Sequence, residues 1–228
     1  MAGTPEAGLA LGNDGTLYGT TAHGGTNDYG TVFKLSTNGV FTSLFSFTGS
    51  NTSFEARSPV LQAKDGYLYG TTIFGGSNGV GTGYGAIYKL KADGSSYKEL
   101  YVFGTVTNSF SYPSDGAFAY AGLIQATDGN FYSTTGYGGI ATNGSVGVHG
   151  GYGTIYRITP DGDFTTLYSF DYGEACVCSY GLPYARLVQA KDGNFYGTTW
   201  SASGTIFRLS VPMPAVFQTP PVTNNTFT

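Results

Sequence analysis

The sequence carries little charge for its length. Asp, Glu, Lys and Arg together make up 11% of the 228 residues, and the formal net charge is -4. The 10 Lys and Arg side chains are scattered, and no basic stripe locally reverses the negative sign. Because a negative protein repels a phosphate backbone, we predict that nucleic acid is not a partner.

Long hydrophobic runs are also lacking. No stretch approaches the ~18 consecutive apolar residues that a membrane-spanning helix needs, so we predict no membrane span. The first residues lack the basic and apolar segments of a signal peptide. We therefore expect the chain to be mature, trimmed or incomplete.

Residues with reactive side chains are few. Cys176 and Cys178 are one residue apart, and such a lone pair lacks the paired ligands of a zinc site, so we expect a local disulfide or two loop thiols. The two histidines, His23 and His149, come without a Gly-x-Ser-x-Gly motif, so a Ser-His nucleophile is poorly supported. We predict no cofactor and no catalytic metal, while loop carbonyls and Asp side chains would still permit structural calcium.

Glycine and aromatic residues are abundant instead. The chain contains 37 Gly, 19 Tyr and 16 Phe. Aromatic side chains favour strands and glycine favours tight turns, so this composition suits short strands in close succession. The same abundance of aromatic side chains argues against disorder.

Four Asp-Gly pairs recur along the chain, at Asp14, Asp65, Asp128 and Asp192. A short apolar run precedes each pair and a phrase close to Leu-Tyr-Gly-Thr-Thr follows it, so each pair predicts a hairpin turn between two strands. A third strand follows in every copy, and a second tight turn leads to a fourth strand in the first three copies. The second strands are predicted at 16–21, 67–72, 130–135 and 194–199, the third at 30–35, 85–90, 153–158 and 204–209, and the fourth at 40–47, 97–103 and 164–170.

Four consecutive antiparallel strands per repeat, with no helical periodicity, predict an all-β fold: a β-propeller built from four four-stranded repeats. We place the repeats in residues 1–210, with blades at about 5–57, 58–119, 120–183 and 184–219, and interpret 220–228 as a linker or the start of a missing domain. The fourth copy lacks an obvious outer strand. Residues 215–219 are one candidate for it. The other is a second chain, in a homodimer whose four-bladed halves close an eight-bladed ring.

The repeated phrases Asp-Gly-x-Leu-Tyr-Gly-Thr-Thr-x-x-Gly-Gly and Gly-Thr-Val-Phe-Lys-Leu resemble the GloVer (Gloeo/Verruco) repeat family of bacterial surface proteins. The resemblance covers residues 5–210 and departs most in the fourth copy, where Trp200-Ser-Ala-Ser203 replaces a Gly-Gly loop. It implies export and a secreted or cell-surface location. It brings no established activity and no catalytic residues. A looser similarity to NHL-type propellers also implies blades.

The longer connections between predicted strands collect at one end of the propeller, which we call the upper end and expect to be the binding end. Two residues after the Thr-Thr pair stand His23, Phe74 and Tyr137, and one residue after it stands Trp200. Flat aromatic rings among polar neighbours suit stacking against sugar rings. The alternative is that these rings pack between adjacent blades.

Four aligned positions precede the innermost strands: Glu6, Arg57, Tyr120 and Tyr184. We expect them near the upper mouth of the central channel, as a polar pocket or, for Glu6 and Arg57, as a structural ion pair. Hydrolysis of a glycosidic bond would need two carboxylates at a controlled separation. The candidate catalytic groups in the upper loops are Glu6, Glu55, Asp115, Asp171, Glu174 and the phenol of Tyr184.

These patterns favour a non-catalytic extracellular module that binds a glycan or another surface partner through its aromatic upper-end loops. Two alternatives stay open: a carbohydrate-active hydrolase or lyase, and an architectural module for surface assembly. The candidate ligand-binding residues are His23, Phe74, Tyr137, Trp200, Arg57 and Tyr120.

Overall fold

The regular structure of this protein is entirely β. The computed structural model describes residues 3–49, 53–76, 83–107, 112–140, 151–170, 182–200 and 204–210, together with the strand at 217–218. Across these residues the strands form four four-stranded antiparallel sheets, and no helix occurs among them. A helix able to span a membrane is accordingly not found in the described part of the chain.

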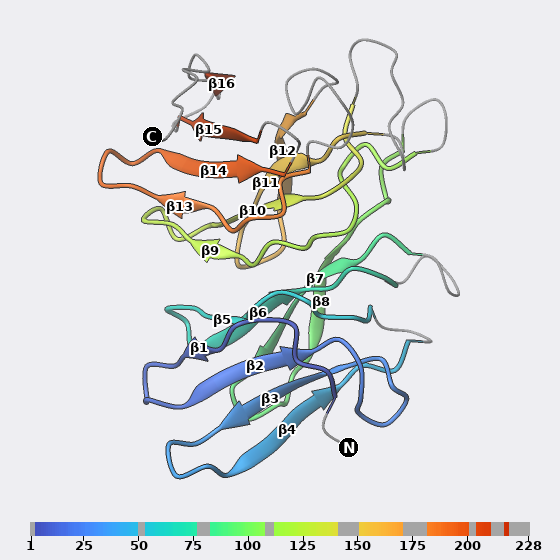
Figure 1. Ribbon diagram of the computed structural model, residues 1–228, viewed down its shortest axis with the longest axis vertical. Coiled ribbons are helices and arrows are strands. Elements are labelled where there is room, and N and C mark those ends of the chain that lie inside the picture. Colours follow the sequence, from blue (N-terminus) through green and yellow to red (C-terminus); the bar gives the residue numbers. More distant parts are fainter. Residues whose placement is uncertain are drawn as a thin grey trace, which may run out of the picture.

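Each sheet consists of four strands that follow one another in the chain, in the order β1-β2-β3-β4, β5-β6-β7-β8, β9-β10-β11-β12 and β13-β14-β15-β16. Figure 1 shows the sheets in sequence order along the long axis, from the sheet of β1 to β4 at the bottom to the sheet of β13 to β16 at the top. The strands are β1 Ala10–Leu11, β2 Leu17–Thr21, β3 Thr31–Leu35, β4 Phe41–Ser46, β5 Leu61–Gln62, β6 Tyr67–Thr71, β7 Ala86–Lys91, β8 Lys98–Val102, β9 Ile124–Gln125, β10 Phe131–Thr135, β11 Thr154–Ile158, β12 Phe164–Ser169, β13 Val188–Gln189, β14 Phe195–Thr199, β15 Thr205–Leu209 and β16 Phe217–Gln218.

The Asp-Gly pairs form the turns between the first two strands of each sheet, as predicted. Asp65 Oδ1 accepts a hydrogen bond from the Tyr67 amide at 3.0 Å, and Asp128 accepts the same bond from Asn130. The glycine that follows the aspartate has a positive φ, 84° at Gly66, which an L side chain adopts only with strain. The aspartate therefore fixes the turn and the glycine permits it.

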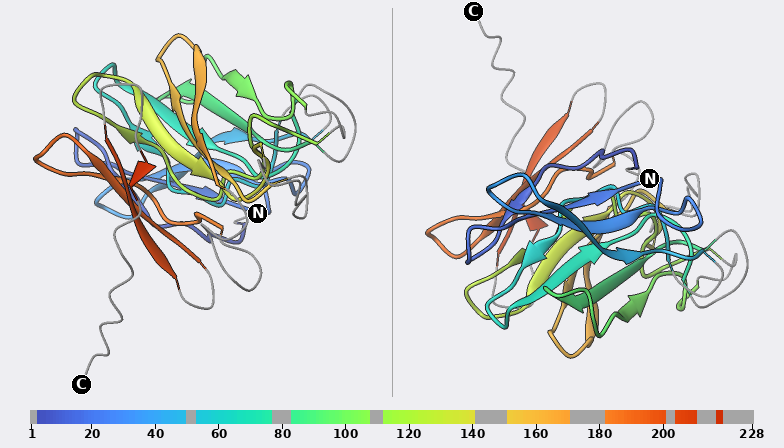
Figure 2. Two further views of the ribbon diagram at one scale, coloured as in Figure 1. Left: turned by 90° about the horizontal axis from the view of Figure 1, so that it is seen from above. Right: turned by 90° about the horizontal axis from the view of Figure 1, so that it is seen from below.

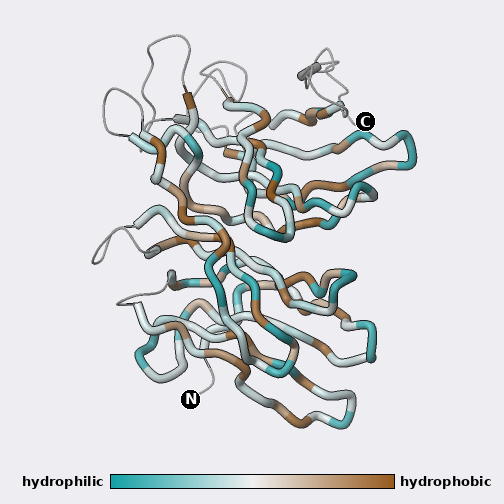
Figure 3. Tube along the Cα trace, turned by 180° about the vertical axis from the view of Figure 1, so that it is seen from behind, coloured by the Kyte–Doolittle hydropathy of each residue, from teal (hydrophilic) through white to brown (hydrophobic). Residues whose placement is uncertain are grey.

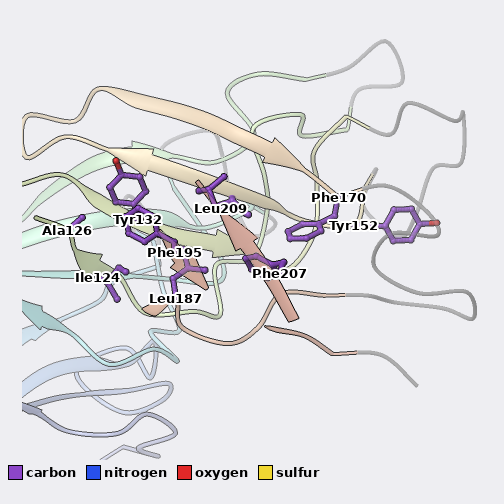
Figure 4. Close-up of a cluster of buried hydrophobic side chains, with 10 residues drawn as sticks. Ile124, Ala126, Tyr132, Tyr152, Phe170, Leu187, Phe195, Phe207 and Leu209 are labelled. Carbon is purple, nitrogen blue, oxygen red and sulfur yellow. The ribbon is translucent and has the colours of Figure 1, made fainter. Parts of the chain in front are cut away.

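The core lies between the sheets, because each strand sends alternate side chains to the two neighbouring blades. Tyr69 of β6 packs on Phe131 of the next sheet with ring centroids 4.2 Å apart, and Tyr132 of β10 packs on Phe195 in the same way at 4.2 Å. Figure 4 shows the second of these interfaces, with side chains from β9 to β15 meeting between two sheets. Figure 3 shows hydrophobic stretches along the strands and hydrophilic ones at the tight turns.

A glutamine at the end of the innermost strand joins each blade to the one before it. Gln62 Oε1 accepts a hydrogen bond from the Asn13 amide at 2.8 Å, Gln125 from Lys64 at 2.9 Å, and Gln189 from Thr127 at 3.0 Å. The first blade has Leu11 at this position. The two further views in Figure 2 show the sheets fanned about these inner strands, which is the arrangement of propeller blades.

The predicted fold class, an all-β propeller of four four-stranded repeats, is confirmed. The outer strand of the fourth sheet is β16, which pairs with β15 through Arg208 and Leu209 and lies inside the predicted segment 215–219. The chain thus fills this edge itself. The predicted linker at 220–228, the cysteine pair, His149, Asp171 and Glu174 lie outside the described residues.

Candidate functional site

The upper end of the propeller lies opposite the Asp-Gly turns, which point to the left in Figure 1. At this end the segment leading into each blade pairs with the residue that follows the second strand of the same blade. Phe54 and Phe74 exchange two backbone hydrogen bonds, of 2.9 and 3.2 Å. Ala117 exchanges two with Tyr137, and Leu182 two with Trp200.

Phe74, Tyr137 and Trp200 therefore occupy one structural position in three successive blades, although Trp200 stands one residue closer to its Thr-Thr pair. The bridge to the incoming segment fixes each backbone in the same place. His23, the fourth residue of the predicted series, lies half-buried after β2 in the first blade. The row of contacting rings described next reaches the first blade at Tyr29 and not at His23.

Aromatic rings touch one another across the first three blades. Tyr29 lies 4.9 Å from Phe54 between centroids, Phe54 lies 5.7 Å from Phe74, and Phe74 lies 5.5 Å from Phe118. Phe118 then meets Tyr137 edge to face at 5.6 Å. Phe118 is buried, and Phe74 and Tyr137 are half-buried against it, so this part of the row also packs the ends of two blades together.

The row continues into the fourth blade through tyrosines. The Tyr184 hydroxyl donates to the Tyr137 hydroxyl at 3.3 Å, and the Tyr184 ring meets Tyr120 at 4.6 Å. On its other side Tyr184 lies roughly parallel to Trp200, with centroids 6.4 Å apart and an interplanar angle of 30°. Trp200 is 65% exposed, so its indole is the open end of the row.

A charged cluster stands beside this row at the start of the first two blades. Arg57 Nη1 lies 3.0 Å from Glu6 Oε2, and Arg57 Nη2 donates to Glu55 Oε2 at 2.9 Å. Glu55 has a left-handed backbone with φ of 57°, which is unusual for a residue other than glycine. The predicted ion pair is thus a cluster of two carboxylates on one guanidinium.

Tyr120 and Tyr184 add two phenol hydroxyls to the upper end, with their rings in contact. Burial raises the pKa of both hydroxyls; Tyr137 adds to the shift at each, and for Tyr120 the positive charge of Arg57 partly offsets it. Both phenols therefore stay protonated at neutral pH and can donate hydrogen bonds. The four positions predicted at the channel mouth form two contacting pairs, Glu6 with Arg57 and Tyr120 with Tyr184.

Asp115 belongs to a different place. It is buried, and its carboxylate accepts hydrogen bonds from the Tyr101 hydroxyl at 2.7 Å and the Gly104 amide at 3.0 Å. It borders a groove of about 720 Å³ on the outer strands of the second and third blades, lined also by Phe164 and Tyr168. Because its bonds fold the loop after β8, Asp115 is a structural residue of that loop rather than a partner of Glu6 or Glu55.

Two aromatic residues of this end were not identified from the sequence. Phe54 and Phe118 bind the row together, yet they lie in irregular segments that do not align between repeats. The pattern that could have revealed them is an aromatic residue that recurs two or three positions before Arg57 and Tyr120. In the described ranges, no three His, Cys, Asp or Glu side chains come together to hold a metal ion.

Comparison with known proteins supports the prediction that the chain is built from repeats. The family model described as the Gloeobacter/Verrucomicrobia repeat matches residues 2–148. No curated protein gives a significant match.

Solved structures share the fold at low identity. A gluconolactonase from Xanthomonas campestris aligns over 93% of this chain and 61% of its own, with 15% identity and a TM-score of 0.54. The extracellular domain of a B. thetaiotaomicron protein named as a hybrid two-component system aligns over 97% of this chain and 22% of that chain, with 16% identity and a TM-score of 0.55. The chain spans less than two thirds of either structure.

Proposed function

Because the chain belongs to the Gloeobacter/Verrucomicrobia repeat family, we propose that it is a non-catalytic extracellular module that binds a carbohydrate at its upper end. The family resemblance implies a bacterial surface or secreted protein, and a structure of the same fold is an extracellular domain. These observations support the location, and the geometry of the upper end supports the ligand class.

The observation that carries the proposal is the exposed indole of Trp200 beside Tyr184. A sugar ring presents an apolar C–H face that stacks on an indole, and hydroxyl groups at its rim that need hydrogen-bond partners. Tyr120 and Tyr184 supply protonated phenols, while Arg57 and its two carboxylates supply further donors and acceptors. The site thus combines an open apolar platform with polar groups on one side.

Glycan binding tests the proposal directly. The purified chain is applied to an array of bacterial, plant and host glycans, and hits are measured by calorimetry. We expect Trp200→Ala to weaken binding by about tenfold or more, the usual result of removing a stacking aromatic at an interface. Val40→Ala removes another exposed apolar side chain far from the upper end, in the turn before β4, and should leave binding unchanged.

Two results would overturn the proposal. One is an array without a selective hit. The other is equal loss of binding in Trp200→Ala and Val40→Ala, which would place the ligand elsewhere.

A hydrolase is the second candidate, supported by one observation: Glu6 and Glu55 contact the same guanidinium, so two carboxylates stand close together at the upper end. The gluconolactonase of the same fold acts on a sugar derivative, which supports the same substrate class. Release of reducing ends, or opening of a sugar lactone, that is lost in Glu55→Gln and in Tyr184→Phe would favour this function. Tight binding without turnover would favour the first.

A further inference from the structure

The three interfaces between blades are built from the same positions. The side of a blade that meets the following blade, its forward face, presents a tyrosine of the second strand and a Val or Ile of the third: Tyr18 and Val32 in the first blade, Tyr69 and Ile87 in the second, Tyr132 and Ile155 in the third. All six are buried.

The opposite side of each blade, its backward face, receives these residues. In the second blade it presents Val60, Leu68 and Leu90, which are at most 3% exposed. The third and fourth blades bury the equivalent residues in the same way. One pair of complementary surfaces therefore recurs three times within the chain.

The forward face of the fourth blade has no following blade against it. Ile206 takes the place of Val32, Ile87 and Ile155, but it is 63% exposed, and Val188 in the innermost strand is also 63% exposed. Thr198 is exposed too. The equivalent threonines are buried and donate to a carbonyl just before the next blade, as Thr134 Oγ1 does to Pro183 at 2.6 Å.

The backward face of the first blade is open in the same way. Leu9 takes the place of Val60 and is 50% exposed, where Val60 is 3% exposed. Phe41 takes the place of Tyr97 and Phe164, whose rings stack on the preceding blade, and it is 50% exposed. Figure 1 places this blade and the fourth blade at opposite ends of the long axis.

We propose that these two open faces bind each other between two copies of this chain, with the forward face of the fourth blade of one copy seated on the backward face of the first blade of the other. The proposed contact repeats an interface that the chain already forms three times, with the same residue types in the same register. It buries Ile206 and Val188 against Leu9 and Phe41.

Such an interface is heterologous, since the two copies contribute different surfaces. A variant with one damaged face therefore cannot associate with itself, because each contact needs both faces. Ile206→Asp damages only the forward face and Leu9→Asp only the backward face. Both residues are at least half exposed in the single chain, so both variants should fold like the wild type, which circular dichroism checks.

Sedimentation measures the assembly. We expect the wild-type chain to associate with rising concentration, and each variant to be weakened on the order of 100-fold, the cost of burying an unpaired carboxylate. An equimolar mixture of Ile206→Asp and Leu9→Asp has one undamaged face of each kind and should form a 1:1 complex that neither variant forms alone.

Leu11→Gln should strengthen the contact. Leu11 stands where Gln62, Gln125 and Gln189 accept an amide hydrogen from the preceding blade, and in the proposed contact that amide is Lys191 of the other copy. The added hydrogen bond should tighten association by about fivefold.

The proposal has three clear ways to fail. A wild-type chain that stays monomeric up to millimolar concentration overturns it, and so does a mixture of the two variants that forms no complex. Leu9→Asp that still dimerises alone would show fourth blades meeting symmetrically, which contradicts the head-to-tail contact. None of these results depends on glycan binding.

Discussion

The lower and upper ends of the same blades are built in different ways. At the lower end, three blades repeat one arrangement: the turn aspartate accepts the amide two residues on and the hydroxyl of a tyrosine four residues on, as Asp65 does from Tyr67 and Tyr69. At the upper end a backbone bridge recurs in three blades, but the side chains it carries differ from blade to blade: Phe74, Tyr137 and Trp200. Glu6 and Arg57 occupy positions that are Tyr120 and Tyr184 in the later blades.

The difference teaches where a repeat can vary. The lower turn is specified within about five consecutive residues, so a changed residue there breaks its own hairpin. The upper end is formed by segments from different parts of the chain held by backbone bridges, such as Ala117 with Tyr137. Its side chains can therefore change without loss of the blade.

The largest contrast we expect is between Tyr132→Ala and Trp200→Ala. Tyr132 is 1% exposed and packs on Phe195, so its removal leaves a cavity between blades and should lower the free energy of unfolding by about 3–5 kcal/mol. Trp200 is 65% exposed, and its loss should change stability by less than about 0.5 kcal/mol. Urea unfolding measures both. Equal losses would mean that the upper end is as structural as the core.

A smaller effect is expected at the lower turns. Asp128→Ala removes bonds from the Asn130 amide and the Tyr132 hydroxyl at a partly solvated site, and should cost about 1 kcal/mol. Asp161→Ala is the matched control, because Asp161 also precedes a turn glycine but its side chain makes no hydrogen bond to the described residues. Thermal unfolding compares the two variants. A control as damaging as Asp128→Ala would show that the turn position, and not these bonds, matters.

Lowering the pH should reduce the stability that the turn aspartates give to the lower end, by a small amount for each residue. The Thr16 amide lowers the pKa of Asp14, and the Asn194 side chain lowers the pKa of Asp192. Since these groups bind protons more weakly when folded, their stabilisation is present above the unfolded pKa of about 3.9 and is lost as the pH falls through the lower folded pKa. Stability measured from pH 5 to pH 2 should fall less steeply in Asp192→Asn than in the wild type. An unchanged slope would contradict this.

Tyr184→Phe tests the upper end with the smallest change in structure, the loss of one hydroxyl group. This variant keeps the ring on Tyr120 and Trp200 and removes only the hydrogen bond to Tyr137, so the free energy of unfolding should fall by about 1 kcal/mol or less. Glycan affinity should fall more than stability does. Loss of stability without loss of affinity would assign the hydroxyl to the fold alone.

The repeated parts of the fold could be predicted from the sequence. Four Asp-Gly pairs and the strand phrases around them are local signals, and the second, third and fourth strands lie within the predicted ranges, apart from β7, which ends one residue later at Lys91. Even the weak outer strand of the fourth blade was placed correctly, because a short run of β-forming residues stands at the expected distance. The innermost strands are shorter than their apolar runs, since only two residues of each pair with the neighbour.

The contacts that link the blades could not be predicted from the sequence. Gln62, Gln125 and Gln189 each end a short apolar run, and their role depends on an amide about 50 to 60 residues earlier in the chain. The ring contacts of Phe54 and Phe118 depend in the same way on bridges between distant segments. Periodicity reveals what each blade contains, whereas contacts between blades depend on their packing in space.

The consecutive strand order within each sheet also has a kinetic consequence. In the described sheets all strand pairing joins strands that are neighbours in the chain, and each blade contacts the next one along, so strand pairing does not require the closure of long loops. Folding can therefore start in any blade and spread to its neighbours, as in other repeat proteins. The middle blades, supported on both sides, should be the last to exchange their amide hydrogens, and the two outer blades the first.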